Sequence, residues 1–155
     1  MKFTIPLPLQ NEHEALHERL RRATQAGGEV GEAAKTLAQL MHPHFIKEDE
    51  FALPPLGLLA ALARGEWSAE MAEVLTLTDQ LEAELPQMLA EHEGIVAALK
   101  TLRDAASRTG RSDIVAFAEP LTEHARTEEE VMYPAAVLVG QLVRQRLGQR
   151  VPAAA

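Results

Sequence analysis

The sequence contains one short motif twice, and the rest of the chain can be interpreted around it. His44 is followed four residues later by Glu48, and His124 is followed four residues later by Glu128. Positions i and i+4 of a helix lie above one another on the same face. Each copy therefore directs one imidazole and one carboxylate the same way. This pair of donors suits iron, zinc or manganese.

The motif belongs to a longer internal repeat. Glu12-His13-Glu14 precedes the first copy, and Glu91-His92-Glu93 precedes the second. His13 lies 31 residues before the first motif histidine, and His92 lies 32 residues before the second. In each copy a proline follows the motif glutamate by six residues. We interpret the chain as two related halves.

Composition favours helix and excludes several classes of protein. Leu, Ala, Glu and Arg dominate, aromatic residues make up 4%, and no strand pattern is present. The net charge of −8 argues against a nucleic-acid partner. The absence of cysteine excludes disulfides, thiolate ligands and cysteine-bound iron–sulfur clusters. At 155 residues, we expect one domain spanning 1–155, with its core at about 9–140.

Targeting and membrane segments are not expected. The first residues lack the apolar core of a signal peptide. The longest uncharged runs, 51–63 and 131–143, have 13 residues each, which is too short for a bilayer-spanning helix. We therefore expect a soluble cytoplasmic protein. These two apolar runs are expected to pack on each other at one end of the molecule or to form a homodimer contact.

Apolar residues at helical spacing predict an all-α, up-down-up-down four-helix bundle with additional short helices. We expect the main helices at about 11–26, 32–51, 86–109 and 112–148, and short helices at about 56–64 and 68–84. Pro86 either kinks the helix before it or starts the third main helix.

Prolines and capping residues give the expected irregular points. Pro6 and Pro8 predict an extended segment at 1–9. Pro43 and Pro120 predict a kink or bulge just before each motif histidine. The expected N-caps are Ser68 and Ser112. The tail at 148–155 is expected to be flexible.

Each main helix places one histidine in its apolar stripe, and a bundle brings these stripes together at its axis. The four histidines are His13, His44, His92 and His124. With the two motif glutamates they offer too many ligands for one tetrahedral zinc, but enough for two metals bridged by Glu48 and Glu128. The alternative is a buried polar network without metal.

The segments HFIKEDEFALP (44–54) and HARTEEEVMYP (124–134) resemble the two signature helices of the hemerythrin-like family, whose domains bind a pair of cations. The resemblance covers about residues 9–140. It implies two iron ions inside a four-helix bundle, with a bridging oxide or hydroxide. Carried over, it makes iron ligands of the four histidines and bridging carboxylates of Glu48 and Glu128.

The chain departs from oxygen-carrying hemerythrins at one position. Those proteins have an H-x-x-x-H pair on the third helix, but Val96 stands four residues after His92. An equivalent pair lies on the first helix, as His13 and His17, so His17 is a seventh candidate ligand. The alternative is that His17 packs in the core or hydrogen-bonds a carboxylate.

The seven candidates suggest a division between the two irons. If His13, His17 and His44 hold one iron, that iron is fully coordinated. The other iron, held by His92 and His124, then keeps an open position that faces Val96. We expect a small molecule to bind there.

Other polar residues near the motifs have simpler expectations. His42 is expected to face solvent. The acidic residues beside the motifs are expected to be surface charge, with hydrogen bonds to the ligands as the alternative: Asp49, Glu50, Glu129 and Glu130. Tyr133 is either a core residue or a hydrogen-bond donor to the centre.

Three functions stay open from the sequence. The resemblance most directly implies binding or sensing of dioxygen. The same centre also suits an enzyme that turns over peroxide or nitric oxide, or a protein that stores or delivers iron. The sequence does not decide whether the chain is an enzyme.

Overall fold

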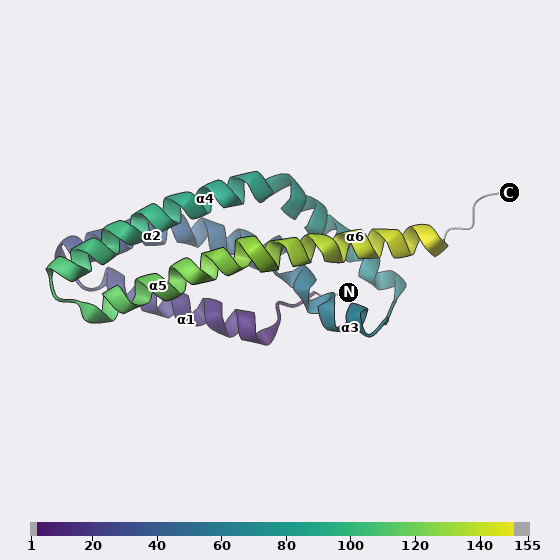
Figure 1. Cartoon of the computed structure of the whole chain (residues 1–155), viewed down its shortest axis with the longest axis horizontal. Helices are drawn as coiled ribbons and strands as arrows, with labels where there is room; N and C mark the ends of the chain where they lie inside the picture. Colours follow the sequence, from purple (N-terminus) through teal and green to yellow (C-terminus); the bar gives the residue numbers. More distant parts are fainter. Residues whose placement is uncertain (1–2, 151–155) are drawn as a thin grey trace.

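The structure, a computed structural model, describes residues 3–150 and the side chains of residues 3–148. It confirms the predicted all-α class, and no strand occurs in this range. Four long antiparallel arms form the up-down-up-down bundle (Figure 1). They are α1 (Leu7–Thr24), α2 (Gly28–Lys47), α4 (Val74–Arg108), and the continuous pair α5 (Ser112–Thr127) and α6 (Tyr133–Arg150). No helix among the described residues is long and apolar enough to cross a membrane.

The first helix starts earlier than its prolines suggested. Pro6 is the N-cap of α1 and Pro8 lies in its first turn, so the predicted extended segment is wrong for residues 7–9. Proline is tolerated in a first turn because the N–H groups there have no partner in the helix. At the other end α1 stops at Thr24, and Gly27 and Gly28 form the turn with positive φ angles.

Two short π-helical turns follow the motif histidines: η1 (Glu48–Ala52) and η4 (Glu128–Met132). The N–H of Leu53 donates to the carbonyl of Glu48 at 2.9 Å, and Tyr133 donates to Glu128 in the same way. Each widened turn ends just before a proline, Pro54 or Pro134. A proline ring clashes with the carbonyl four residues earlier in an α-helix, and widening the turn relieves this clash.

No bulge lies just before the motif histidines, where one was predicted. Helices α2 and α5 continue through Pro43 and Pro120, and the widened turns begin at the motif glutamates instead. Each turn therefore starts at a residue of the candidate centre, where π-bulges are often found.

Short helices connect α2 to α4: η2 (Pro54–Leu58), α3 (Leu59–Ala63) and η3 (Ala69–Glu73). The first two match the predicted helix at about 56–64, but most of the helix predicted at about 68–84 is the start of α4. Ser68 precedes η3 as predicted, but its side chain makes no capping bond. The N-cap of α5 is Arg111 rather than Ser112. Pro86 lies inside the 35-residue helix α4, which changes direction along its length (Figure 1).

Helix α6 continues to Arg150, two residues beyond its predicted end at about 148. The part of the predicted flexible tail at 151–155 lies outside the described residues.

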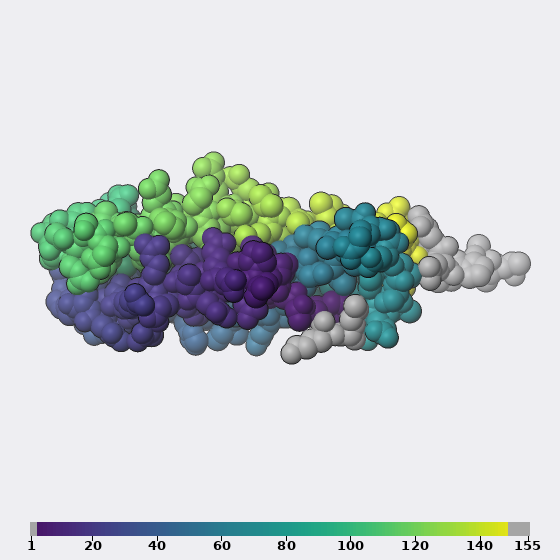
Figure 2. Space-filling view, turned by 90° about the horizontal axis from the view of Figure 1, so that it is seen from below, coloured from purple at the N-terminus to yellow at the C-terminus, as the bar shows by residue number. Residues whose placement is uncertain are grey.

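The two apolar runs pack on each other at one end of the elongated molecule. Leu58 from η2 and Val139 and Val143 from α6 belong to one buried cluster, together with Met71 and Val74. This confirms the first of the two expected arrangements. Figure 2 shows α1 along one face of the molecule, with the segment that contains α3 towards this end.

The buried stripes on α1 and α4 follow the same register. On α1 the stripe is His13, Leu16, Leu20 and Ala23, and on α4 it includes His92, Ile95, Leu99 and Leu102. In both helices the next buried residue after the histidine lies three positions later, not four. His17 and Val96 therefore occupy equivalent places at the edge of the stripe, and both are exposed.

Candidate metal centre

The four histidines and two glutamates meet in the bundle interior as two groups of ligand atoms. The His44 group contains the Nε2 atoms of His44 and His92, which lie 2.8 Å apart, with one oxygen from each of Glu48 and Glu128. The His13 group contains Nε2 of His13 and His124 with an oxygen of Glu128. The two imidazole rings have centroids 4.5 Å apart in the first group and 5.0 Å apart in the second.

The two glutamates lie between the groups. In Glu48, Oε1 is 3.2 Å from Nε2 of His44, and Oε2 is 3.7 Å from Nε2 of His13. In Glu128, Oε2 is 3.4 Å from Nε2 of His92, and Oε1 is 2.8 Å from Nε2 of His124 and 3.2 Å from that of His13. Glu128 thus turns one oxygen towards each pair of histidines, as a bridging ligand does, and Glu48 turns one oxygen towards one histidine of each pair.

Burial and unmet hydrogen bonding fit a metal at this place. Glu48 is 0% exposed, Glu128 is 1% exposed, and all four histidines are buried. Within residues 3–148, Glu48 Oε2 and both ring nitrogens of His124 have no hydrogen-bond partner; the 2.8 Å contact of His124 Nε2 with Glu128 is not aligned as a hydrogen bond. Buried polar atoms without partners are costly. A cation held at the His13 group would satisfy Glu48 Oε2 and His124 Nε2.

Two buried carboxylates so close together repel each other. Burial, and then the charge of Glu128, raises the pKa of Glu48. Burial would also raise the pKa of Glu128, but its contacts with His124, His13 and His92 lower it well below its usual value. Without metal, one carboxylate is therefore held ionised and the other is driven towards its neutral form. A bound cation would stabilise the ionised form of both carboxylates.

The histidines are also charged more easily than usual. Burial lowers the pKa of His124, but the close contact with Glu128 and its charge raise the pKa more, to about 9. In His13, His44 and His92 too, burial lowers the pKa, but contacts with glutamates raise it more. In the metal-free protein, protonated histidine rings supply the positive charge that bound metal would otherwise supply.

Each histidine has a second carboxylate at its other ring nitrogen. Nδ1 of His44 is 2.7 Å from Glu91, and Nδ1 of His92 is 2.8 Å from Glu129. Nδ1 of His124 is 3.2 Å from Glu12, and Nδ1 of His13 is 3.6 Å from Asp49. The hydrogen bonds at His44 and His92 fix the tautomer that leaves Nε2 free for a metal, whereas Glu12 and Asp49 lie near Nδ1 of His124 and His13 without a hydrogen bond.

The sequence suggested these outer carboxylates only in part. Asp49 and Glu129 were expected as surface charge, with hydrogen bonds to the ligands as the alternative. Both are exposed as expected, but Glu129 also hydrogen-bonds His92, and Asp49 lies 3.6 Å from His13. Glu12 and Glu91 were noted only as part of the repeat. The repeat could have identified them, because the two halves supply these contacts in the same pattern: the residue before His13 and His92, and the residue after Glu48 and Glu128.

Tyr133 enters the His44 group from the first turn of α6. Its hydroxyl donates to Oε1 of Glu48 at 2.5 Å and lies 3.3 Å from Nε2 of His44 and 3.4 Å from Nε2 of His92. The side chain is fully buried. Burial, and then the charges of Glu48 and Glu128, raise the pKa of this phenol strongly.

The structure does not bring His17 into either group. Its ring is exposed and stacks on Phe45, with centroids 4.2 Å apart and an interplanar angle of 25°. His42 is exposed as predicted. The expected division of histidines between two metals is wrong, because His44 pairs with His92 and His13 pairs with His124.

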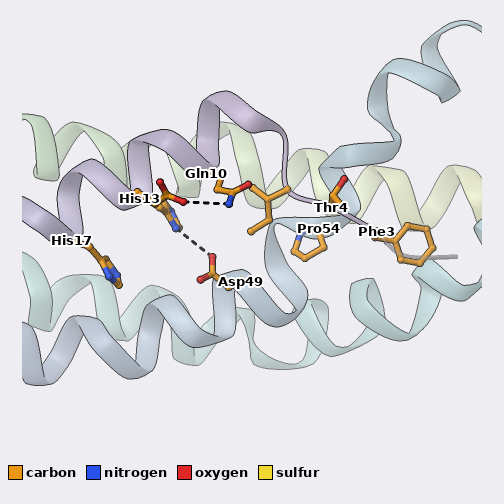
Figure 3. Close-up of a pocket in the computed structure, with 9 residues that line it drawn as sticks. Phe3, Thr4, Gln10, His13, His17, Asp49 and Pro54 are labelled. Atoms are coloured by element: carbon orange, nitrogen blue, oxygen red, sulfur yellow. Dashed lines mark hydrogen bonds and ion pairs between the residues drawn. The ribbon is translucent and has the colours of Figure 1, made fainter.

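The predicted guest site beside Val96 is also wrong. Val96 is 39% exposed and lines a surface cavity with Leu99 and Lys100, among others. A different cavity, of about 320 Å³, borders His13 (Figure 3). In that view His13 points towards Asp49 between α1 and η1, and His17 lies farther along α1.

These observations define an all-α bundle protein with a buried His/Glu cluster that can hold metal. Comparison with known families agrees: the model described as Hemerythrin HHE cation binding domain matches residues 8–136. The chain therefore belongs to the hemerythrin HHE cation-binding family. Searches of curated proteins and of solved structures found no match.

Proposed function

We propose that this chain holds two iron ions and binds or senses dioxygen or a related small molecule. The position of Glu48 and Glu128 between the two groups supports this proposal most strongly, because each carboxylate turns one oxygen towards a histidine of each pair. Each metal would then have two imidazole nitrogens and two carboxylate oxygens. An oxide or hydroxide between the metals would add a further ligand to both.

The donor set favours iron over zinc. A structural zinc takes four ligands and closes its shell, whereas bridging carboxylates and a further bridging oxygen suit ions that accept five or six ligands. The histidines are ligands for iron and zinc alike, so the number of ligands is the stronger argument. A pair of iron ions would supply electrons to a small oxidant.

The residues of the chain set the conditions for this chemistry. Glu91 and Glu129 hold the imidazoles of His44 and His92 with Nε2 turned inward, and Glu12 and Asp49 lie beside Nδ1 of His124 and His13. Apolar side chains lie on both sides of the centre along each helix; on α4, for example, Met88 and Ile95 flank His92. These side chains exclude water and limit entry to small molecules.

Entry is proposed on the side of His13. The cavity of about 320 Å³ reaches this histidine from the surface, between α1, η1 and the chain before α1 (Figure 3). Its lining mixes apolar residues with Gln10, Glu14 and Asp49. A cavity of this size can hold a diatomic molecule beside His13.

The first test is metal content after expression with ample iron. The parent should hold about two metal ions per chain, mainly iron. Glu128→Ala should lose most of this metal, because the residue serves both groups. Glu130→Ala is the matched control, since Glu130 is exposed and pairs with Arg126. A parent with one zinc ion, or with no metal, would contradict the proposal.

The second test separates the possible uses of the centre. The reduced, iron-loaded protein is mixed with dioxygen in a stopped-flow spectrometer. An absorbance change that vacuum reverses supports binding or sensing. Rapid, irreversible oxidation supports an enzyme that acts on peroxide or nitric oxide, and loss of iron during repeated cycles supports iron handling.

A further inference from the structure

We infer that Tyr133 is an oxygen ligand of the iron held by His44 and His92, so that the two irons of the proposed centre are chemically unequal. This inference rests on the proposed function, because it needs iron at the His44 group. It adds a ligand that the repeated H-x-x-x-E motif does not contain.

The spacing of donor atoms carries the inference. Around an ion with six ligands at about 2.1 Å, neighbouring ligand atoms lie roughly 3 Å apart. The hydroxyl of Tyr133 lies 3.3 Å from Nε2 of His44, 3.4 Å from Nε2 of His92 and 2.5 Å from Oε1 of Glu48. The two Nε2 atoms are 2.8 Å apart, and that of His44 is 3.2 Å from Oε1 of Glu48. The hydroxyl is therefore placed as a neighbouring ligand of one ion.

The backbone holds Tyr133 in this position. Its N–H donates to the carbonyl of Glu128 across the widened turn η4, so the residue is tied to the same glutamate that lies between the two groups. Its ring lies nearly parallel to that of His92, at 22° and 5.8 Å between centroids. The side chain is 0% exposed, so the hydroxyl points to the centre and not to solvent.

The repeat shows that this residue makes the halves different. Tyr133 comes five residues after Glu128, and the residue five after Glu48 is Leu53. Leucine has no donor atom, so the equivalent ligand is absent from the first half. The proposed iron at His44 and His92 gains a phenolate, while the iron at His13 and His124 keeps a free position on the side of the cavity. On ligation the O–H bond is replaced by an iron–oxygen bond, and the proton is released to the buffer.

Tyrosine is a known ligand of iron in proteins. Phenolate bound to oxidised iron gives a visible charge-transfer band and ring vibrations that are enhanced when the laser excites that band. The chain contains one tyrosine, so such a signal has a single source. The test records absorption and resonance Raman spectra of the oxidised, iron-loaded protein, with iron content measured on the same samples.

The expected result is a phenolate band in the parent that disappears in Tyr133→Phe while that variant still binds iron. Thr78→Val is the matched control: it removes another fully buried hydroxyl, one that donates to Leu75, and it should keep the band. Ring-deuterated tyrosine incorporated into the unaltered protein should shift the enhanced vibrations. This labelling experiment does not depend on the folding of any variant.

Two results overturn the inference, and they are distinguishable. If the parent binds two irons but shows no tyrosine vibrations that respond to the label, Tyr133 only donates a hydrogen bond to Glu48, and the proposed function still stands. If the parent binds no iron, the proposed function fails and the inference fails with it.

Discussion

Oε2 of Glu91 lies 2.7 Å from Nδ1 of His44, across the contact between α4 and α2. The same carboxylate is anchored through Oε1 to Lys47 at 2.7 Å. Burial raises the pKa of Glu91, but the hydrogen bonds from Lys47 and His44 lower it more, so the carboxylate is ionised at neutral pH. The second half of the chain thus orients the motif histidine of the first half.

Glu91→Gln should weaken metal binding without unfolding the protein. An amide accepts the Nδ1–H bond less strongly, so the imidazole is a poorer and less well-oriented ligand. Loss of such an outer carboxylate typically lowers metal affinity by about 10–100-fold. Competition with a coloured iron chelator measures this affinity. Glu93→Gln is the control, because Glu93 is exposed two residues further along the same helix. Equal affinities in the two variants would show that the Glu91–His44 contact has no role in binding.

His17→Ala should keep both metal ions. Its ring is exposed, stacks on Phe45 and belongs to neither ligand group. His13→Ala, one turn earlier on the same helix, should lose at least one ion, because His13 is buried against Glu128 at 3.2 Å. Mass spectrometry under native conditions can count the ions in each variant. Loss of an ion from His17→Ala would mean that this side chain swings into the centre when metal binds.

The metal-free protein should lose stability as the pH rises from about 6.5 to 9. The pKa of His124 is raised to about 9 in the folded state, while an unfolded histidine titrates near 6.5. A group with a raised folded pKa stabilises fully below its unfolded pKa, and this contribution disappears as the pH passes its folded pKa. The raised pKa of Glu48 acts in the same direction. Urea unfolding of the chelator-treated protein at several pH values measures the effect.

Two variants check the origin of this pH dependence. His124→Gln should flatten the fall in unfolding free energy between pH 6.5 and 9, whereas His42→Gln, at an exposed histidine, should retain it. A parent that becomes more stable over this range would contradict the prediction. Bound metal replaces the protons, so the loaded protein should depend less on pH.

Much of the fold and the membership of the centre followed from helical spacing. The i, i+4 motif and the apolar stripes were enough to bring four histidines and two glutamates together, because a helix fixes which side chains share a face. The pairing of the histidines needed more information. The pairing depends on how each helix is rotated about its axis. On α4 the rotation buries Ile95 together with His92 and leaves Val96 exposed.

The widened turns and the outer carboxylates were harder to predict for different reasons. A proline such as Pro54 requires some distortion upstream, but several local geometries relieve the same clash, so the sequence did not fix the place. Glu91 and Glu129 resemble the many other glutamates on exposed helix faces until the helices are packed. The position of Tyr133 combines both problems, since it depends on the widened turn η4 and on the packing of α4 against α6.

Gly140→Ala should destabilise the protein, because α6 passes very close to α4 at this glycine. A Cβ atom at Gly140 would overlap Oγ1 of Thr78 and lie 2.7 Å from its Cβ. Thr78 is fully buried and cannot move away freely. Overpacking of this kind costs about 1–3 kcal/mol, more than the roughly 1 kcal/mol that alanine gains over glycine in a helix. We expect a fall of a few degrees in Tm, measured by circular dichroism.

Gly94→Ala is the matched control, since it lies inside α4 and a Cβ there meets nothing within 4 Å. This variant should be more stable than the parent by up to about 1 kcal/mol. The double variant Gly140→Ala/Thr78→Gly moves the glycine to the other helix. It should lose less than the sum of its two single changes, because the overlap is removed. If Gly140→Ala and Gly94→Ala raise Tm equally, the close approach of α6 to α4 is not present in solution.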